Sequence, residues 1–318
     1  MLHIRVISPA SATDAVVGCL REATGVTNLV VLPGVARSPE GDLVEFDVAR
    51  EAANGVIDAL RGLGIETSGS IAVEKIDIAI SEAADRAREE APGEGDDAVV
   101  WEELAQRVAD DSRMTWAFIV FLVIATQLAA IGVLLNSPIL IVGAMVLGPE
   151  FGPIAAVCFG LLQREWGLIG TAVRNLLVGF AVAIAATLAC ALVARGLGWI
   201  QPAMIAEGNT EEVNFIVKPD RWSFIVALLA GVAGVLSVTA GKSSSLVGVF
   251  ISVTTVPAAG YAAVAVALGD WAEVGHAALQ LGVNLLGMVI AGTLTLLVQR
   301  LLWGRYGERV GPRPRSDR

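Results

Sequence analysis

The chain has 318 residues, of which 55% are apolar, and its mean hydropathy is +0.67. These values exclude an ordinary soluble enzyme, because the surface of a globular protein of this size needs more polar cover. Charge is divided unevenly: residues 1–113 carry 10 Lys and Arg against 22 Asp and Glu, whereas residues 114–318 carry 12 against 10. We therefore expect an acidic soluble region, followed by a lipid-facing region that begins near Met114.

The first residues, Met1 to Pro9, lack the basic start, the long apolar core and the cleavage site of a secretory signal. The first region is therefore expected to stay in the cytoplasm. Its acidity argues against binding nucleic acid, which needs clusters of Lys and Arg. The cysteines are far apart in the sequence, so we expect no disulfide framework, no metal site and no cofactor. They are Cys19, Cys158 and Cys190.

Residues 1–80 are predicted to form a small α+β domain with the order βαββαβ, that of a ferredoxin-like sandwich. A turn is expected at Gly41-Asp42, and His3 is interpreted as an ordinary strand residue. Because no cluster of His, Cys or carboxylates has site-like spacing here, assembly or regulation is favoured over catalysis. The predicted strands are Leu2–Ile7, Thr27–Leu32, Leu43–Val48 and Ser70–Ile76, and the predicted helices are Thr13–Ala23 and Ala52–Leu63.

Residues 81–113 are expected to link the two regions. The stretch Ser81–Asp97 is charged and is interrupted by Pro92-Gly93, which favours a solvated helix that frays into a linker. After it, apolar side chains recur at helical spacing and predict an amphipathic helix that lies on the membrane surface. These side chains are Trp101, Leu104, Ala105 and Val108.

Residues 114–303 contain six apolar runs long enough to cross a bilayer. With a cytoplasmic start, an even number of spans puts Arg164, Lys242 and the basic tail 304–318 inside and the acidic loop 196–221 outside, as the positive-inside rule requires. Tryptophans stand at the span ends, where indole rings favour the interface. The runs are 115–135, 138–162, 167–194, 222–240, 244–268 and 273–302, and the tryptophans are Trp116, Trp166, Trp199, Trp222, Trp271 and Trp303.

The two halves of this region resemble one another after a shift of 105 residues. A duplicated unit of three spans must insert in opposite orientations, which gives the inverted repeat common among transporters and channels. A duplication that serves only the structure is the alternative. The shift superposes Gly143 on Gly248, Trp166 on Trp271, Gly170 on Gly275 and Leu176 on Leu281, and Trp116 matches Trp222 with one extra residue.

The second span contains two prolines and two glycines within Gly148–Pro153, so its helix is expected to break near the middle of the bilayer. The corresponding place in the second half holds Thr254-Thr255-Val256-Pro257. Paired breaks of this kind indicate a translocation site, because freed carbonyls and half-helix ends can bind a solute. Pro149, Gly152, Pro153, Thr254 and Thr255 are therefore candidate path residues.

Glu150 is the most informative single residue, because a carboxylate at that depth is costly unless it is protonated, paired or hydrated. A proton-, cation- or substrate-binding role competes with a structural ion pair or a neutral buried acid. Arg174 in the third span is the expected partner, although it can instead extend its guanidinium to the interface. Asn175, beside it, matches Gln280 in the other half.

In the last span His276, Gln280 and Asn284 recur every four residues and therefore share one helix face. This polar stripe can line an aqueous path. Hydrogen bonding between helices explains it equally well.

The segment from Gly143 to Ile154, GAMVLGPEFGPI, resembles the signature of the prokaryotic membrane family catalogued as domain of unknown function 389. The likeness covers roughly residues 115–300, and Pro149, Gly152 and Pro153 match the pattern directly. Family members frequently carry an apolar residue where Glu150 stands. The resemblance implies a multi-span protein of a prokaryotic plasma membrane, often with a soluble extension.

The leading hypothesis is a membrane transporter or channel for a small solute or ion, with a cytoplasmic regulatory or assembly domain and both termini in the cytoplasm. The alternative is a membrane-anchored ligand sensor or scaffold without transport activity. An enzyme is not expected, because the spans contain no paired carboxylates, zinc ligands or nucleophile–base set. Small residues in the spans predict a homo-oligomer in the lipid bilayer.

Overall fold

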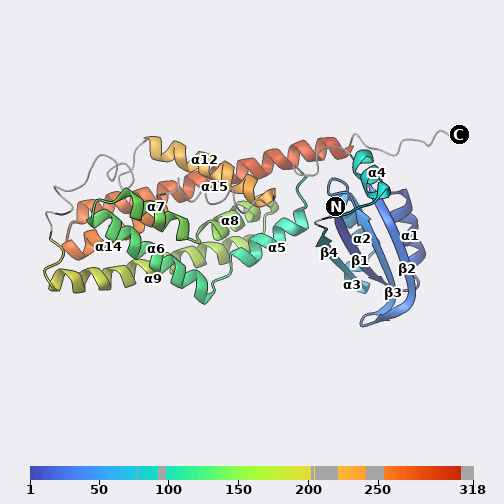
Figure 1. Ribbon diagram of the computed structural model, residues 1–318, viewed down its shortest axis with the longest axis horizontal. Coiled ribbons are helices and arrows are strands. Elements are labelled where there is room, and N and C mark those ends of the chain that lie inside the picture. The colour runs from blue at the N-terminus through green and yellow to red at the C-terminus, as the bar shows by residue number, and fades with distance from the viewer. Residues whose placement is uncertain (77, 92–97, 202–203, 205–220, 241–253, 309–318) are drawn as a thin grey trace. The chain divides into compact units, whose positions relative to one another are not determined.

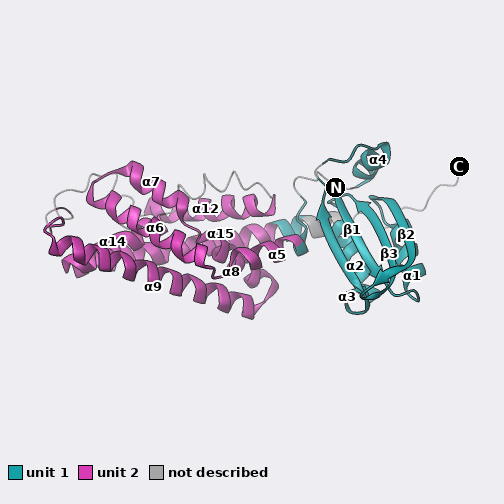
Figure 2. Cartoon of the chain, turned by 60° about the horizontal axis from the view of Figure 1, so that its bottom comes forward, with its two compact units in different colours: residues 1–102, 299–318 teal, residues 103–298 magenta. Residues whose placement is uncertain are grey.

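The computed structural model describes residues 1–76, 78–91, 98–201, 204, 221–240 and 254–308, with side chains up to residue 302. The chain divides into two compact units, which are drawn in different colours in Figure 2. Unit 1 comprises residues 1–102 and 299–318, and unit 2 comprises residues 103–298. Several predicted features lie outside the described residues: Pro92-Gly93, Lys242, Gly248, most of the loop 196–221 and the end of the basic tail.

Unit 1 contains the predicted βαββαβ arrangement, with a short extra helix before the last strand (Figure 1). All strand pairs are antiparallel, and the sheet order is β2-β3-β1-β4. This is the strand order expected for a ferredoxin-like sandwich. The elements are β1 (Leu2–Ser8), α1 (Thr13–Glu22), β2 (Val26–Arg37), β3 (Glu40–Val48), α2 (Ala53–Gly62), α3 (Ile65–Ser68), β4 (Ser70–Lys75) and α4 (Glu82–Glu90).

Alternation along the strands creates the core of this unit. In β1, Leu2, Ile4 and Val6 are buried, and they pack with apolar side chains of β3, α1 and α2. Because successive strand residues point to opposite faces, His3 and Arg5 lie on the other face of the sheet. His3 pairs with Asp47 there, at 2.8 Å from Nδ1 to Oδ1.

Two local expectations for this unit need correction. The chain reverses between Arg37 and Glu40, so the predicted turn at Gly41-Asp42 lies inside β3. The charged segment after residue 80 forms the expected helix, α4, with its N-cap at Ser81, but the helix is not fully solvated because it buries Ala84 and Ala87. Residues 98–102 also belong to this compact unit.

Helix α5 (Trp101–Asp111) also departs from expectation. Its apolar residues Leu104 and Val108 are buried and line a small space together with residues of the helix bundle, including Phe159 and Val235. The apolar face of α5 therefore packs on protein and does not face lipid. The spacing of Leu104 and Val108 indicates an amphipathic helix. It does not indicate whether lipid or protein covers the apolar face.

Unit 2 is a helix bundle. Among the described residues, four helices are long and apolar enough to cross a membrane, or five if one bent pair counts as a single span. Six spans are thus not all seen, and the first part of the predicted fifth span lies outside the described residues. The helices are α6 (Trp116–Leu134), α7 (Pro138–Leu147), α8 (Phe151–Gln163), α9 (Trp166–Gly196), α12 (Arg221–Thr239), α14 (Thr255–Leu268) and α15 (Trp271–Glu308).

The bent pair is α7 and α8, which meet at an angle of 53°. Helix α14 has only 14 residues, or about 21 Å, which is too short to cross the apolar core of a bilayer by itself. Most residues of α8 and α14 are buried, whereas the long helices expose many apolar side chains. The short helices therefore form the interior of unit 2.

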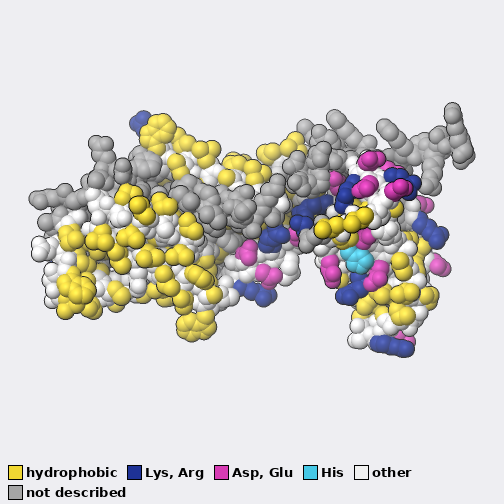
Figure 3. Space-filling view, in the orientation of Figure 1, with side chains coloured by type: hydrophobic (Ala, Val, Ile, Leu, Met, Phe, Trp, Pro, Cys, Tyr) yellow, Lys and Arg dark blue, Asp and Glu magenta, His cyan; other side chains and the backbone are white. Residues whose placement is uncertain are grey.

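The surfaces of the two units differ in composition. Figure 3 shows hydrophobic side chains over the described part of unit 2, while most charged side chains lie on unit 1 and around α5. Apolar surface of this extent is expected of a protein in lipid. The span-end tryptophans Trp116, Trp166, Trp199, Trp222 and Trp271 are all exposed.

Gly69 provides a test of the packing in unit 1. A Cβ at this position lies 1.9 Å from the carbonyl oxygen of Ile7 in β1, whereas a Cβ at Gly55 in α2 meets nothing within 4 Å. We expect Gly69→Ala to destabilise unit 1 and Gly55→Ala to stabilise it by about 0.5–1 kcal/mol through reduced chain entropy. Hydrogen exchange of β1 and β4 amides in the full chain measures both effects. Unchanged exchange in Gly69→Ala contradicts this packing.

Candidate functional site

Two helix starts meet inside unit 2. Helix α8 begins at Phe151 and α14 begins at Thr255, and each has a proline as its third residue, Pro153 and Pro257. A proline in the first helical turn loses no hydrogen bond, because the first N–H groups of a helix have no partner within the helix. The prolines therefore favour helix starts at these places, and Gly148-Pro149 ends α7 just before the first of them.

The two starts are joined by a side-chain contact. The Thr255 hydroxyl donates a hydrogen bond to Oε1 of Glu150, at 2.5 Å. Glu150 is 3% exposed, and its second carboxyl oxygen, Oε2, has no hydrogen-bond partner. That oxygen occupies the space where a side chain at Gly148 would start, 2.2 Å from an ideal Cβ. Gly148 thus makes room for the carboxyl group, and Glu150 is held between the two helix starts.

Burial disfavours the charged form of this carboxyl group, and its surroundings offset part of that cost. Glu150 is the N-cap residue of α8, and Thr255 is the first residue of α14. Each helix N-terminus carries a partial positive charge that stabilises an anion by up to about 2 kcal/mol. A hydrogen bond to a charged group contributes roughly 1.5–3 kcal/mol. Together these terms are comparable with the roughly 2.5–3.5 kcal/mol that a charged residue costs at the centre of a membrane helix.

A second set of polar side chains lies next to this contact. Thr254, the N-cap residue of α14, accepts hydrogen bonds from Gln280 Nε2 at 2.9 Å and from Asn284 Nδ2 at 2.6 Å. Gln280 and Asn284 are buried, and Oε1 of Gln280 has no partner. The adjacent threonines therefore connect Glu150 on one side with two amides of α15 on the other.

Two predicted residues lie away from this cluster. Arg174 is exposed on α9, whereas Glu150 is buried and bonds to Thr255, so the expected ion pair is not formed. His276 is exposed and lies 3.5 Å from Glu273 on its own helix. The polar stripe of the last span therefore divides, because its buried members Gln280 and Asn284 contact Thr254 while His276 does not. An arginine can bury its stem and leave its charge outside, which sequence spacing alone does not reveal.

Asn175 and Gly152 serve a different contact. Asn175 donates from Nδ2 to the carbonyl of Ser112 at 2.8 Å, and a Cβ at Gly152 lies 2.5 Å from the carbonyl of Asp111. The first contact holds the chain just after α5 against α9, and the second holds the end of α5 against the start of α8. No residue pattern indicates this role, because the acceptors are backbone carbonyls of another segment, which any residue type provides.

Within the described residues, no group of three or more His, Cys, Asp and Glu side chains is arranged to hold a metal ion. The cluster around Glu150 offers one carboxylate and neutral oxygens and amides. In this structure it can accept a hydrogen bond or bind a positive charge.

Comparison with known proteins supports the family resemblance. The model of the family described as Domain of unknown function (DUF389) matches residues 145–290, which include every residue of the cluster. The chain is 24% identical to Uncharacterized protein MJ0678 of Methanocaldococcus jannaschii over 169 residues, which is 53% of this chain and 50% of that protein. The chain thus spans about half the length of this curated relative. No solved structure matches the chain.

The Glu150–Thr255 contact can be measured with a double-mutant cycle. Thr255→Val leaves both carboxyl oxygens without a partner, so we expect a loss of about 1–3 kcal/mol, seen as a lower melting temperature of the purified chain. The same change in a Glu150→Leu background is expected to cost much less. Thr295→Val is the matched control, because its hydroxyl bonds only to Ala291 of its own helix. Equal losses with and without Glu150 contradict the contact.

Proposed function

Residues 145–290 of this chain belong to the family described as Domain of unknown function (DUF389), and on this premise we propose that the protein is a membrane transporter or channel for a small solute or ion. The path runs between the two helix starts, past Glu150. One observation carries the proposal: the buried carboxyl group bridges two helix starts and keeps one oxygen without a partner. Unwound backbone and half-helix ends at a buried polar site are the usual binding elements of membrane transporters.

An inverted repeat is part of the proposal. A shift of 105 residues carries both bounds of α6, 116 and 134, onto those of α12, 221 and 239. The same shift carries the end of α8 at 163 onto the end of α14 at 268, and the start of α9 at 166 onto the start of α15 at 271. The sequence identity between the two halves is low, so this agreement is not obvious from the sequence. The matching helix bounds support two halves of the same design.

The backbone repeats in detail where α8 and α14 end. Glu165 N–H donates to the carbonyl of Gly160 at 2.9 Å, and 105 residues later Asp270 N–H donates to the carbonyl of Ala265 at 3.0 Å. The residues just before, Arg164 and Gly269, both have positive φ, at 60° and 80°. An arginine rarely adopts that conformation, so its place opposite a glycine supports a shared backbone design.

The shift also gives meaning to the Glu150–Thr255 contact, because these residues are 105 positions apart. In two copies related by a two-fold axis, a residue that touches its own counterpart lies at that axis. The candidate site is therefore at the interface of the halves, where transporters with inverted repeats bind their cargo. Rocking of one half against the other is the motion that opens such a site.

The chemistry of the site narrows the cargo. With Glu150 charged, Oε2 accepts a hydrogen bond or a positive charge and repels an anion, so a proton, a cation or a neutral solute with donor groups is favoured. Val256 also packs at Gly148 beside the carboxyl group, which is closed off from solvent. We take the described conformation as a closed state.

Flux measurements test the proposal. The purified chain in liposomes is expected to pass protons, monovalent cations or small polar solutes, and Glu150→Gln is expected to lower the flux at least tenfold because the carboxylate is lost. Glu165→Gln is the matched control, since Glu165 is exposed and lies outside the cluster. Absence of flux across such a panel, or equal flux in Glu150→Gln, contradicts the proposal.

The six-span topology makes a separate prediction. Six spans put both termini on the same side of the membrane, in the cytoplasm, whereas five put them on opposite sides. We expect cysteines introduced by Ser11→Cys and Ser316→Cys to react with an impermeant maleimide from the same side. The background is Cys19→Ser with Cys190→Ser, since Cys158 is buried and does not compete. Labelling from opposite sides excludes an even number of spans.

The second candidate function is a membrane-anchored sensor or scaffold, favoured by the polar sheet face of unit 1. On that face Asp47 accepts a hydrogen bond from Asn28 Nδ2 at 2.7 Å and contacts His3. A face with a positioned carboxylate suits the binding of a ligand. The same face can also bind a second copy of the chain and so form a homo-oligomer. Binding of a ligand that Asp47→Asn abolishes, in a chain without flux, favours this function.

A further inference from the structure

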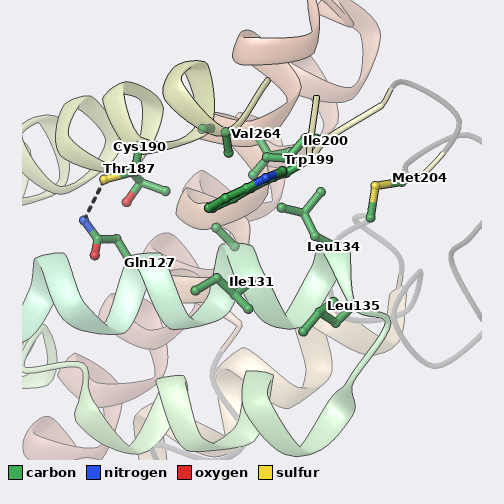
Figure 4. A pocket seen from close by; sticks show the side chains of 13 residues that line it. Gln127, Ile131, Leu134, Leu135, Thr187, Cys190, Trp199, Ile200, Met204 and Val264 are labelled. Atoms are coloured by element: carbon green, nitrogen blue, oxygen red, sulfur yellow. Dashed lines mark hydrogen bonds between the residues drawn. The ribbon is translucent and has the colours of Figure 1, made fainter. Parts of the chain in front are cut away.

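A pocket of about 340 Å³ lies between α6, α9 and α14, apart from the Glu150 cluster. Its walls are mainly apolar: Ile131 and Leu134 come from α6, Ala191 from α9 and Val264 from α14. Trp199 and Ile200 line it beyond the end of α9, and Figure 4 shows the flat indole ring of Trp199 across from Ile131. The volume is in the range of small-molecule sites.

Small side chains on facing helices create this space. Ala130 of α6 and Ala191 and Ala194 of α9 all line the pocket, so three methyl groups stand where larger side chains could fill it. An apolar cavity does not hold water well, because water there finds too few hydrogen-bond partners. An empty cavity also leaves its walls without contact partners. Both arguments favour an apolar occupant.

One end of the pocket is polar. The Thr187 hydroxyl is buried and has no hydrogen-bond partner, and the side chain is 2% exposed. Gln127 Nε2 lies 3.5 Å from Cys190 Sγ, a weak acceptor that leaves the amide capable of a better bond. Figure 4 shows these three side chains together. A buried hydroxyl without a partner is unfavourable, and an oxygen atom of a ligand relieves it.

The position of the pocket identifies the source of the occupant. Helices α6 and α9 both qualify as membrane spans, and the pocket lies along their C-terminal halves. A molecule that reaches it therefore comes from the bilayer. None of the described residues that line the pocket is charged. A charged head group consequently has no counter-charge there, whereas a neutral polar group can bond to Thr187 and Gln127.

We propose that this pocket binds a neutral amphiphile from the membrane, an apolar chain that ends in a hydroxyl or carbonyl group. The chain lies against Ile131, Leu134 and Val264, and the polar group bonds to Thr187. This site does not depend on the proposed transport function, since it shares no residue with the Glu150 cluster.

Photolabelling of the full chain in nanodiscs tests the proposal. Three probes carry the same diazirine-bearing chain: a long-chain alcohol, the corresponding alkane and the corresponding carboxylic acid. The alcohol is expected to label the pocket walls on α6 and α9 about two- to tenfold more than the alkane, the gain typical of one hydrogen bond. The ionised acid is expected to label them less than the alcohol.

Variants separate the pocket from the general lipid surface. Ala191→Phe fills the pocket and is expected to lower wall labelling at least tenfold, as is Ala130→Leu from the opposite wall. Leu192→Phe is the matched control, because Leu192 is exposed on the neighbouring face of α9. Thr187→Val is expected to remove the preference for the alcohol over the alkane, and Thr171→Val, an exposed threonine of the same helix, is expected to keep it.

The result that overturns the proposal is equally specific. Labelling of the walls that is the same in Ala191→Phe, Ala130→Leu and Leu192→Phe indicates ordinary contact with bulk lipid. A preference for the alcohol that persists in Thr187→Val, or a stronger signal from the acid, excludes the neutral head group. Melting temperatures of each variant show that the bundle is folded during these measurements.

Discussion

The structure of unit 2 depends on one constraint: backbone that leaves the helical pattern at membrane depth must be covered by protein, because lipid offers no hydrogen-bond partners. The chain breaks its helix at Gly148-Pro149, and another helix begins at Thr255. Both places lie inside the bundle. The short helices α8 and α14 are consequently buried on nearly all sides, and the long helices form the surface that meets lipid.

Close packing around the short helices requires small residues. A side chain at Gly234 of α12 would collide with the ring of Phe151, and one at Gly260 of α14 would meet the backbone of α6 at Thr126. Without a hydrophobic force between helices in lipid, such close approach supplies much of the attraction. The glycines of these helices therefore allow the close packing that covers the helix breaks with protein. Small residues also leave a space between Ala130 of α6 and Ala191 and Ala194 of α9. This space is the apolar pocket.

The Glu150 cluster shows how the same break produces chemistry. Ending one helix and starting another exposes unpaired N–H groups, and two such starts next to each other create a positive potential that offsets part of the cost of burying a carboxyl group. The carboxyl group then connects the starts of α8 and α14 through Thr255. This bond resists separation of the two helix starts, and its loss favours their separation. Stability and proposed transport thus involve the same contact.

The sequence by itself determined the division into an acidic soluble region and a lipid-facing region, because charge and hydropathy are averages over many residues. It also determined the order βαββαβ, since a period of two persists along strands such as Leu2–Val6 and a period of 3.6 persists along the helices. The sequence located the break at Gly148–Pro153 as well, because proline acts on its own backbone. Tertiary structure alone decided the partner of Glu150, the exposure of Arg174 and His276, and the cover over Leu104 and Val108. Partners are set by which helix faces meet, and residue spacing along one helix places side chains on a face without stating what that face contacts. The pocket near Thr187 had no sequence signal for the same reason, because a cavity is formed by residues that several helices leave small.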